Sequence, residues 1–275
     1  MKQFLILVLK GMLIGIGKVI PGVSGSLIAV SLGVYEKAIE AIGNFFKNIK
    51  ENILFLGTLA IGIVFSIAFG SKIIIYLLEI FYVPTLLLFV GFIAGVLPSL
   101  YHKIGNKNKR YYFYFMISFL FVFFLDLCSS NANFYPEKNL LSYLLIVGIG
   151  FLDAATMIIP GISGTAIFII LGCYSFVLNL FSSISSVIEI FSNFDYLFSF
   201  GIGLLIGIIA ISHLINYMLK NNRDTMYALI MGFTSSSIFV LIEKALEPMH
   251  TGLEFIIGIF LAYVGYRLSI KFEKE

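Results

Sequence analysis

Few residues in this chain are suited to covalent or metal chemistry. Only two cysteines, Cys128 and Cys173, and three histidines, His102, His213 and His250, occur among its 275 residues. Two cysteines exclude a disulfide framework, and we expect both to be free thiols. The histidines lie on different segments without metal-ligand spacing, and no H-E-x-x-H, Walker or Rossmann pattern occurs. We therefore expect no catalytic residues, no metal, no cofactor and no enzymatic activity.

Charge is also scarce. Charged residues make up 12% of the chain and hydrophobic residues 60%, with a mean hydropathy of +1.03. A soluble domain has about 25% charged and about 45–50% apolar residues. No polar stretch is long enough for a separate soluble domain, so we expect residues 1–275 to form one integral membrane domain. The net charge of +3 comes from basic loops, which report orientation in a membrane protein, and no nucleic-acid partner is expected.

The chain does contain a duplicated motif. Pro21–Gly25 reads P-G-V-S-G and Pro160–Gly164 reads P-G-I-S-G, at an offset of 160 − 21 = 139 residues. The likeness extends to both sides of the motif. For example, Leu32–Tyr35 (L-G-V-Y) corresponds to Leu171–Tyr174 (L-G-C-Y). We interpret residues 1–127 and 140–275 as internal repeats. Duplicated units with broken helices are typical of secondary transporters, whose site lies where the repeats meet near the bilayer midplane.

Apolar runs predict an all-α polytopic membrane protein. About 20 apolar residues span the hydrocarbon as a helix. Six runs qualify, namely Ile53–Phe69 with a possible extension to Leu78, Tyr82–Leu100, Tyr111–Leu127, Tyr196–Leu219, Met226–Ile242 and Leu253–Ile270. Each motif instead separates two arms, which are Phe4–Ile20 with Ser26–Ile42 and Leu140–Ile159 with Thr165–Leu180. We interpret each motif with its arms as a re-entrant helical hairpin, so that each half holds one hairpin and three transmembrane helices.

Loop charge predicts the orientation, because short cytoplasmic loops are enriched in lysine and arginine. The loop His102–Arg110 holds four basic residues and is placed inside, whereas the lysine-poor Ser129–Asn139 is placed outside. When the chain is followed span by span from these two loops, Lys47, Lys220 and both chain termini lie on the cytoplasmic side of a bacterial plasma membrane. Because each half has three spans, the two hairpins enter from opposite faces. The repeats are therefore predicted to be inverted.

Both motifs offer groups that bind anions. Proline fixes φ at a helix start, and glycine lets the backbone approach a ligand closely. Free N–H groups at a helix N-terminus attract anions, and serine or threonine hydroxyls add donors. The candidate phosphate-binding residues are Lys18, Pro21, Gly22, Ser24, Gly25, Ser26, Pro160, Gly161, Ser163, Gly164 and Thr165. The alternative is that both motifs are structural turns whose hydroxyls satisfy nearby carbonyls.

Lys18 and Asp153 are the charges nearest the motifs. A lone charge in the membrane costs at least about 2.5–3.5 kcal/mol, so Lys18 needs a partner. In one interpretation it pairs with Asp153 as a structural ion pair. In the other, Lys18 meets an anionic headgroup and Asp153 is a proton or ion coupling site.

Two further patterns concern the helices themselves. The Gly-x-x-x-Gly pairs that start at Gly11, Gly91 and Gly203 predict close helix contacts. The polar run Thr234–Ser237 lies in mid-span, and it fits either a polar path or interhelical hydrogen bonds.

At the motifs the sequence resembles the bacterial polyprenyl-phosphate transporter family. The resemblance rests on Lys10–Gly15, Ile20–Gly25, Leu32–Glu36, Met157–Gly164 and Leu171–Tyr174, and it extends over nearly the whole chain. It implies return of undecaprenyl phosphate from the outer to the inner leaflet, for reuse in cell-envelope synthesis. Many members carry an acidic or amide residue where this chain has Lys18, and glycine where it has Ser26. An acidic role at the first position is therefore not carried over.

Physical reasoning agrees with a lipid substrate. A phosphate on a long isoprenoid must cross hydrocarbon while its tail stays in lipid, and paired anion sites that open sideways provide such a path. The alternative function is a channel or exchanger for a small anion. A third, a membrane-embedded lipid enzyme, lacks clustered acid, base or metal ligands.

Overall fold

The computed structural model describes residues 2–19, 23–105, 108–127, 134–183, 187–246 and 252–274. Within these ranges every regular element is a helix. The helices are α1 (Lys2–Val19), α2 (Gly25–Ser31), α3 (Tyr35–Gly43), α4 (Ile49–Phe65), the π-helical turn η1 (Ser66–Gly70), α5 (Ser71–Ile80), α6 (Tyr82–Ala94), α7 (Leu97–Lys103), α8 (Lys109–Leu127), α9 (Leu140–Ile158), α10 (Gly164–Ile170), α11 (Tyr174–Ser182), α12 (Val187–Ser192), α13 (Phe194–Asn221), α14 (Arg223–Leu246) and α15 (Gly252–Lys274).

Five helical stretches in the described ranges are long and apolar enough to cross a membrane. They are Tyr82–Lys103 (α6 with α7), Leu140–Ile158 (α9), Phe194–Asn221 (α13), Arg223–Leu246 (α14) and Gly252–Phe272 (α15). An all-helical polytopic membrane protein is thus confirmed. Four of the five match expected spans. The fifth, α9, was expected to be a hairpin arm, and its 19 residues are also enough to cross.

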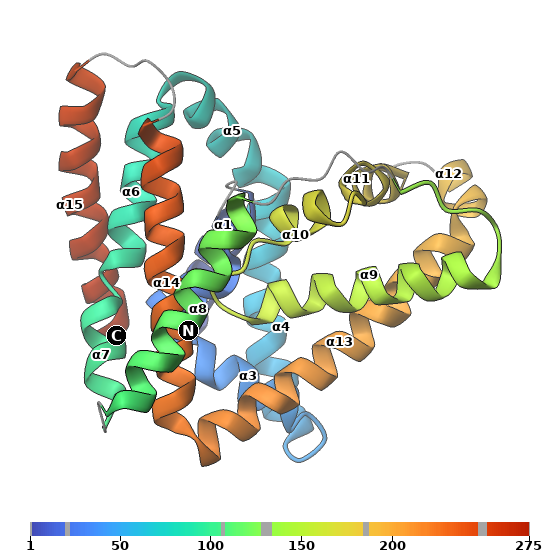
Figure 1. Cartoon of the computed structure of the whole chain (residues 1–275), viewed down its shortest axis with the longest axis horizontal. Coiled ribbons are helices and arrows are strands. Elements are labelled where there is room, and N and C mark those ends of the chain that lie inside the picture. The colour runs from blue at the N-terminus through green and yellow to red at the C-terminus, as the bar shows by residue number, and fades with distance from the viewer. Residues whose placement is uncertain are drawn as a thin grey trace.

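The other two expected spans also form helices. α8 contains the expected span Tyr111–Leu127. The run from Ile53 lies in α4, which has 17 residues and continues through the π-helical turn η1 into α5. A π-helical turn interrupts the i→i−4 hydrogen-bond ladder and lets a helix change direction. In Figure 1, α5 accordingly leaves the direction of α4 and leads toward the start of α6.

Glycines let the long helices pack in four close pairs. A methyl group at Gly11 of α1 would overlap the Leu59 carbonyl of α4. One at Gly203 of α13 would overlap Val147 of α9. A methyl group at Gly91 of α6 would likewise overlap α15, and one at Gly232 of α14 would overlap α8. The predicted role of the Gly-x-x-x-Gly pairs in close helix contact is therefore confirmed.

The segment that follows each motif is two short helices rather than one arm. α2 and α10 have 7 residues each, and α3 and α11 have 9. Gly33 and Gly172 separate them, with φ of 68° and 67°. The N–H of Val34 bonds to the carbonyl of Ala29, and the N–H of Cys173 to that of Phe168, as in a glycine-terminated helix. Each of the expected arms Ser26–Ile42 and Thr165–Leu180 therefore holds two helices, because glycine in a left-handed conformation ends the first helix.

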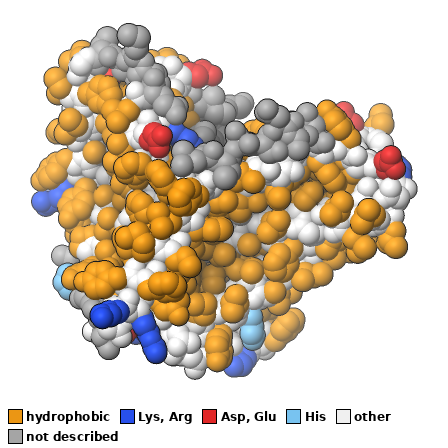
Figure 2. Space-filling model, viewed as in Figure 1, with side chains coloured by type: hydrophobic (Ala, Val, Ile, Leu, Met, Phe, Trp, Pro, Cys, Tyr) orange, Lys and Arg blue, Asp and Glu red, His pale blue; other side chains and the backbone are white. Residues whose placement is uncertain are grey.

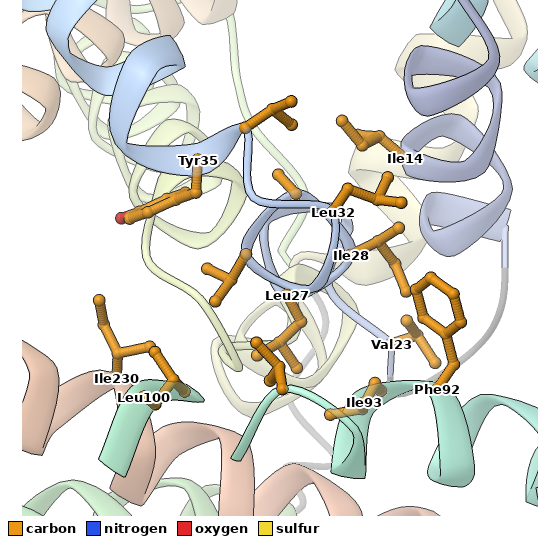
Figure 3. Packing of buried hydrophobic residues seen from close by; sticks show 14 of the residues in the cluster. Ile14, Val23, Leu27, Ile28, Leu32, Tyr35, Phe92, Ile93, Leu100 and Ile230 are labelled. Carbon is orange, nitrogen blue, oxygen red and sulfur yellow. The ribbon is translucent and has the colours of Figure 1, made fainter. Parts of the chain in front are cut away.

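The segments that follow the two motifs differ in how deeply they lie in the protein. All seven residues of α2 are buried. Figure 3 shows Leu27 and Ile28 of α2 and its C-cap Leu32 among side chains of the surrounding helices, including Ile14 of α1 and Ile93 of α6. α10 and α11 belong to a smaller cluster with α9 and the start of α13, and Ile169 and Leu171 beside them are exposed. In Figure 1, α9 and α13 extend away from the upright group of α6, α14 and α15.

Hydrophobic side chains cover much of the outer surface. Figure 2 shows them over most of the visible face, as expected where lipid replaces water. Several lysine and arginine side chains lie along the lower edge, where Figure 1 places α7 and the turn between α13 and α14. This basic edge is defined by Lys103, Lys220 and Arg223, and ion pairs join all three to α3.

Candidate functional site

The first motif places two buried hydroxyls at the start of α2. The Oγ atoms of Ser24 and Ser26 lie 2.6 Å apart. Ser24 is the N-cap residue of α2, but its side chain does not cap the helix. The N–H groups of Gly25 and Ser26 therefore lack intrahelical partners, as in any first helical turn. Pro21 and Gly22, also predicted in this site, lie outside the described residues.

The two motifs meet through the backbone of α9. The Ser26 hydroxyl donates to the Ile159 carbonyl at 3.2 Å, and Ile159 directly precedes Pro160 of the second motif. The Tyr35 hydroxyl donates to the Ile158 carbonyl at 3.0 Å. Carbonyls at the end of a helix have no intrahelical donor. The hydroxyls of Ser26 and Tyr35 thus supply donors to the carbonyls at the end of α9.

Only one proton is available on each serine hydroxyl, which fixes the direction of this network. Because Ser26 donates to Ile159, Ser24 must donate to Ser26. A short relay therefore runs from the first motif to the second. In this conformation Ser26 behaves as the alternative interpretation predicts, because its hydroxyl satisfies a nearby carbonyl.

Helix α14 packs against the second motif at Gly161. Gly161 has φ of +85°, and its carbonyl accepts a hydrogen bond of 3.0 Å from the Ser237 hydroxyl. A Cβ atom at Gly161 would lie 2.8 Å from backbone atoms of Phe233. Ser237 therefore makes the interhelical bond that was one interpretation of the polar run. The Ser236 hydroxyl in the same run is buried and meets no hydrogen-bond partner within the described residues.

Asp153 lies beside the second motif. Its Oδ1 atom is 3.5 Å from the position of a Cβ atom at Gly164, and the Thr156 hydroxyl is 2.7 Å from that position. The Thr156 hydroxyl donates to the Asp153 carbonyl at 2.8 Å. Ser163 is half-buried and takes part in a polar interaction. The side chains of Lys18 and Thr165 lie outside the described residues, and so does the predicted contact between Lys18 and Asp153.

An ionic cluster on α3 was not predicted from the sequence. Glu36 contacts Lys103 of α7 at 2.9 Å and Arg223 of α14 at 3.9 Å, and it accepts a hydrogen bond from Tyr227. Burial tends to raise the pKa of Glu36, but the hydrogen bonds from Tyr227 and Lys103 and the positive charges of Lys103 and Arg223 hold it below its usual value. One helical turn on, Glu40 contacts Lys220 at 3.1 Å. The i,i+4 spacing of Glu36 and Glu40 was the available signal, because it puts both carboxylates on one face.

Lys10 is a second residue that the sequence did not single out. Its side chain is buried, and its Nζ donates to the Leu32 carbonyl at 2.9 Å and to the Phe272 carbonyl at 3.4 Å. Leu32 is the C-cap of α2, so the ammonium group compensates the negative end of that helix. Lys10 thus links the C-terminal end of α2 to the C-terminal end of α15.

Comparison with known proteins identifies the family. A model described as undecaprenyl phosphate translocase-like (VCA0040-like) matches residues 14–251. The chain belongs to this family. It is 32% identical over 249 residues to the polyprenyl-phosphate transporter of Staphylococcus aureus, which covers 87% of both chains. It is 28% identical over 238 residues to the polyprenyl-phosphate transporter of Vibrio cholerae, which covers 82% of this chain and 73% of the relative.

No solved structure gives a significant match. The membership in the translocase-like family confirms the resemblance that the paired motifs predicted. Relatives named as transporters agree with a transport function rather than catalysis.

Proposed function

We propose that this protein moves polyprenyl phosphate, with undecaprenyl phosphate as the natural case, across the plasma membrane and so returns the carrier lipid for reuse. The observation that carries this proposal is the meeting of two near-identical motifs in a chain of the translocase-like family. The polar groups of both motifs lie together in the interior of the protein, whereas the outer surface is mostly apolar. A lipid with one charged end needs such a path for its phosphate while its tail stays in the bilayer.

We place the phosphate site between the two motifs. Ser24 and Ser26 supply hydroxyls from one side, and Ser163 supplies one from the other. Gly25, Gly161 and Gly164 are the backbone positions proposed for the site, and at Gly161 and Gly164 the space of a side chain is taken by Phe233 and by the Thr156 hydroxyl. The remaining residues proposed for the site, on the pattern of the motifs alone, are Lys18, Pro21, Gly22, Pro160 and Thr165.

Substrate must compete with the relay from Ser24 to Ile159. In the conformation described, the Ser26 proton is engaged by the Ile159 carbonyl. A phosphate that binds Ser26 takes over this donor and separates the two motifs locally. Binding and a change in the contact between the hairpins are therefore coupled. Asp153 is the proposed proton or ion coupling residue, because its carboxylate lies beside Gly164.

The proposal includes an inverted repeat with re-entrant hairpins and cytoplasmic termini. Two observations support it. The short helices after each motif recur at the same offset, since Gly164 − Gly25 and Tyr174 − Tyr35 both give 139 residues. The ion pairs of Lys103, Lys220 and Arg223 all involve α3, so two predicted cytoplasmic loops, the one after α7 and the turn between α13 and α14, contact the same helix.

A flipping assay with the purified full-length protein in liposomes tests the function. A water-soluble phosphatase added outside hydrolyses only polyprenyl phosphate in the outer leaflet, so transport makes the inner pool accessible as well. We expect the inner pool to become accessible only in liposomes that contain the protein. Release of a trapped small anion without lipid movement would favour the channel or exchanger. Loss of the lipid phosphate without added phosphatase would favour an enzyme.

Variants of the motif hydroxyls test the site. Ser24→Ala and Ser163→Ala each remove one donor from one side of the divided site. We expect each to slow lipid movement while the unfolding temperature stays near that of the wild type. Normal transport by both variants would mean that the hydroxyls serve the turns alone.

A further inference from the structure

A polar cavity lies apart from the motifs, between α1, α3 and α4. Its volume is about 980 Å³, and Lys220 at the end of α13 reaches its rim. Four lysines line it, namely Lys10, Lys37, Lys47 and Lys220, against two glutamates, Glu40 and Glu51. The lining therefore carries a net charge of +2. None of these residues belongs to the two motifs.

Two of the lysines have no carboxylate partner in the part of the chain that the structure describes. Lys220 is paired with Glu40, and Lys10 is bound to backbone carbonyls. Lys37 lies over the ring of Phe55, with its Nζ 4.6 Å from the ring centre. Among the residues that the structure describes, neither Lys37 nor Lys47 has an ion pair. Both are exposed, so their charges are available to a ligand in the cavity.

The cavity also has an apolar side that reaches the outer surface. Phe4 and Leu54 line it, and their side chains are 47% and 69% exposed. In a membrane protein such exposed apolar side chains contact lipid tails. A ligand with a charged head and a hydrocarbon tail can therefore place its head among the lysines and its tail against α1 and α4. Basic pockets beside membrane helices at the cytoplasmic side are typical binding sites of lipid headgroups.

The charge of the cavity favours a particular headgroup. A phosphate monoester carries about −1.5 to −2 charges near pH 7, which matches two unpaired lysines and a net charge of +2. A phosphodiester lipid carries a single charge and would leave one lysine unmatched. Lys10 connects the cavity to the first motif, because it holds the C-terminal end of α2 while Ser24 lies at the other end. The seven residues of α2 span about 10 Å.

We propose that the cavity between α1, α3 and α4 is a second binding site for the phosphate of a lipid phosphate monoester, one length of α2 away from the motifs. The choice of lipid rests on the proposed function, and the site gives that lipid a place to dock at the basic edge before or after it passes the motifs. Lys37 and Lys47 bind the phosphate, and Phe4 and Leu54 contact the tail.

Binding to the purified full-length protein in detergent tests the proposal, with farnesyl phosphate as the probe. We expect Lys37→Gln combined with Lys47→Gln to weaken one class of farnesyl phosphate sites by about 10- to 30-fold, since each lysine near a membrane surface contributes about fivefold. Lys50→Gln is the matched control, because Lys50 is an exposed lysine of the same region that does not line the cavity. Lys37→Arg with Lys47→Arg should keep the binding, because charge is retained.

Each result supports or overturns the proposal. Unchanged binding by the double glutamine variant, or equal weakening by Lys50→Gln, would overturn it. Inorganic phosphate that competes as well as farnesyl phosphate would show a free-phosphate site, and phosphatidylglycerol that competes equally would show a site without preference for monoesters. Lysine-dependent binding without lipid flipping in liposomes would contradict the proposed function and leave the cavity as a lipid phosphate site. Lipid flipping together with binding that does not depend on the lysines would overturn the proposed cavity site and leave the proposed function intact.

Discussion

The Ser26 hydroxyl of the first motif lies 3.2 Å from the Ile159 carbonyl, directly before the second motif, and donates to it. The two residues are 133 positions apart in the chain. Ile159 is the C-cap of α9, so its carbonyl has no donor within its own helix. The bond therefore joins the two halves of the chain at the place where their motifs meet.

Removing this bond should weaken the contact between the hairpins. Ser26→Ala leaves the Ile159 carbonyl without its donor, and an unsatisfied buried polar group costs about 1–3 kcal/mol. We expect a lower unfolding temperature and slower lipid flipping in liposomes. Ser31→Ala is the matched control, because Ser31 is a buried serine of the same helix whose hydroxyl bonds within α2, to the Leu27 carbonyl. Equal slowing by both variants would indicate a general weakening of α2 instead.

Gly161 should tolerate no side chain. Its φ of +85° lies in a region that costs an L-residue about 1–2 kcal/mol, and a Cβ atom would approach Phe233 to 2.8 Å. We expect Gly161→Ala to lower the unfolding temperature and to abolish most lipid flipping, since α14 must move away from the motif. Gly148→Ala in α9 is the control, because a Cβ atom there meets nothing within 4 Å. Normal transport by Gly161→Ala would show that this close approach is not needed.

The sequence predicted the features that repeat along single helices. Apolar runs gave the helical spans, and glycine spacing gave the helix contacts, because both depend on local periodicity. The breaks at Gly33 and Gly172 were missed, although both glycines were visible in the repeat. Apolar residues continue across each break, so periodicity alone does not mark it.

The candidate site was predictable in composition but not in its contacts. The paired motifs marked Ser24, Ser26 and Gly161 as candidate site residues. Their partners include the carbonyls of Ile158 and Ile159, and every residue type carries a carbonyl. The same holds for Lys10, whose acceptors are the carbonyls of Leu32 and Phe272. A sequence pattern cannot mark backbone acceptors, which only the fold brings into reach.

The Glu36 cluster should make stability depend on pH in the acid range. The pKa of Glu36 lies below its ordinary value of 4.5, despite burial, because Tyr227, Lys103 and Arg223 favour the charged form. A carboxylate with a lowered pKa stabilises the fold above its unfolded-state pKa, and this contribution is lost as pH falls through the folded-state pKa. Glu36→Gln should therefore lower the unfolding temperature at pH 7, and the difference from wild type should shrink below pH 4.5.

The size of this effect is modest because Glu36 is partly exposed. Its side chain is 41% exposed, and ion pairs of that kind contribute about 0.2–1 kcal/mol each. Thermal unfolding in detergent between pH 7 and the acid range measures it. Glu79→Gln, which changes an exposed glutamate of α5, should show no such pH dependence. A difference that stays constant with pH would mean that the cluster acts through packing and not through charge.

Accessible cysteines should report the threading of the second hairpin. In a background with Cys128→Ser and Cys173→Ala, single cysteines are introduced at Lys109, Glu137 and Glu189. We expect a membrane-impermeant maleimide added to intact cells to label Glu137→Cys and Glu189→Cys, and to label Lys109→Cys only after permeabilisation. The hairpin from α9 to α11 lies between the two outer positions, so re-entry keeps them on one face. Labelling of Glu189→Cys from the inside alone would show that α9 crosses without return.

Lys18 and Asp153 should distinguish a binding role from a structural pair. Lys18 lies in the last turn of α1, and Asp153 of α9 lies beside the second motif. If Lys18 meets the lipid phosphate, Lys18→Gln weakens binding of polyprenyl phosphate while the protein without lipid keeps its stability, because a costly buried charge has been removed.

If Lys18 instead pairs with Asp153, Lys18→Gln leaves a buried carboxylate without its partner. Breaking a buried pair in this way costs about 3–5 kcal/mol of stability. Adding Asp153→Asn should restore that stability, because both charges are then gone. The measurement is a double-mutant cycle on unfolding temperature, with lipid binding followed on the same four proteins. The binding role predicts additive effects on stability, with weak lipid binding in both variants that lack Lys18. A stable double variant that binds and flips the lipid normally would remove Lys18 from the phosphate site, and the anion would then be held by the hydroxyls and backbone of the two motifs alone.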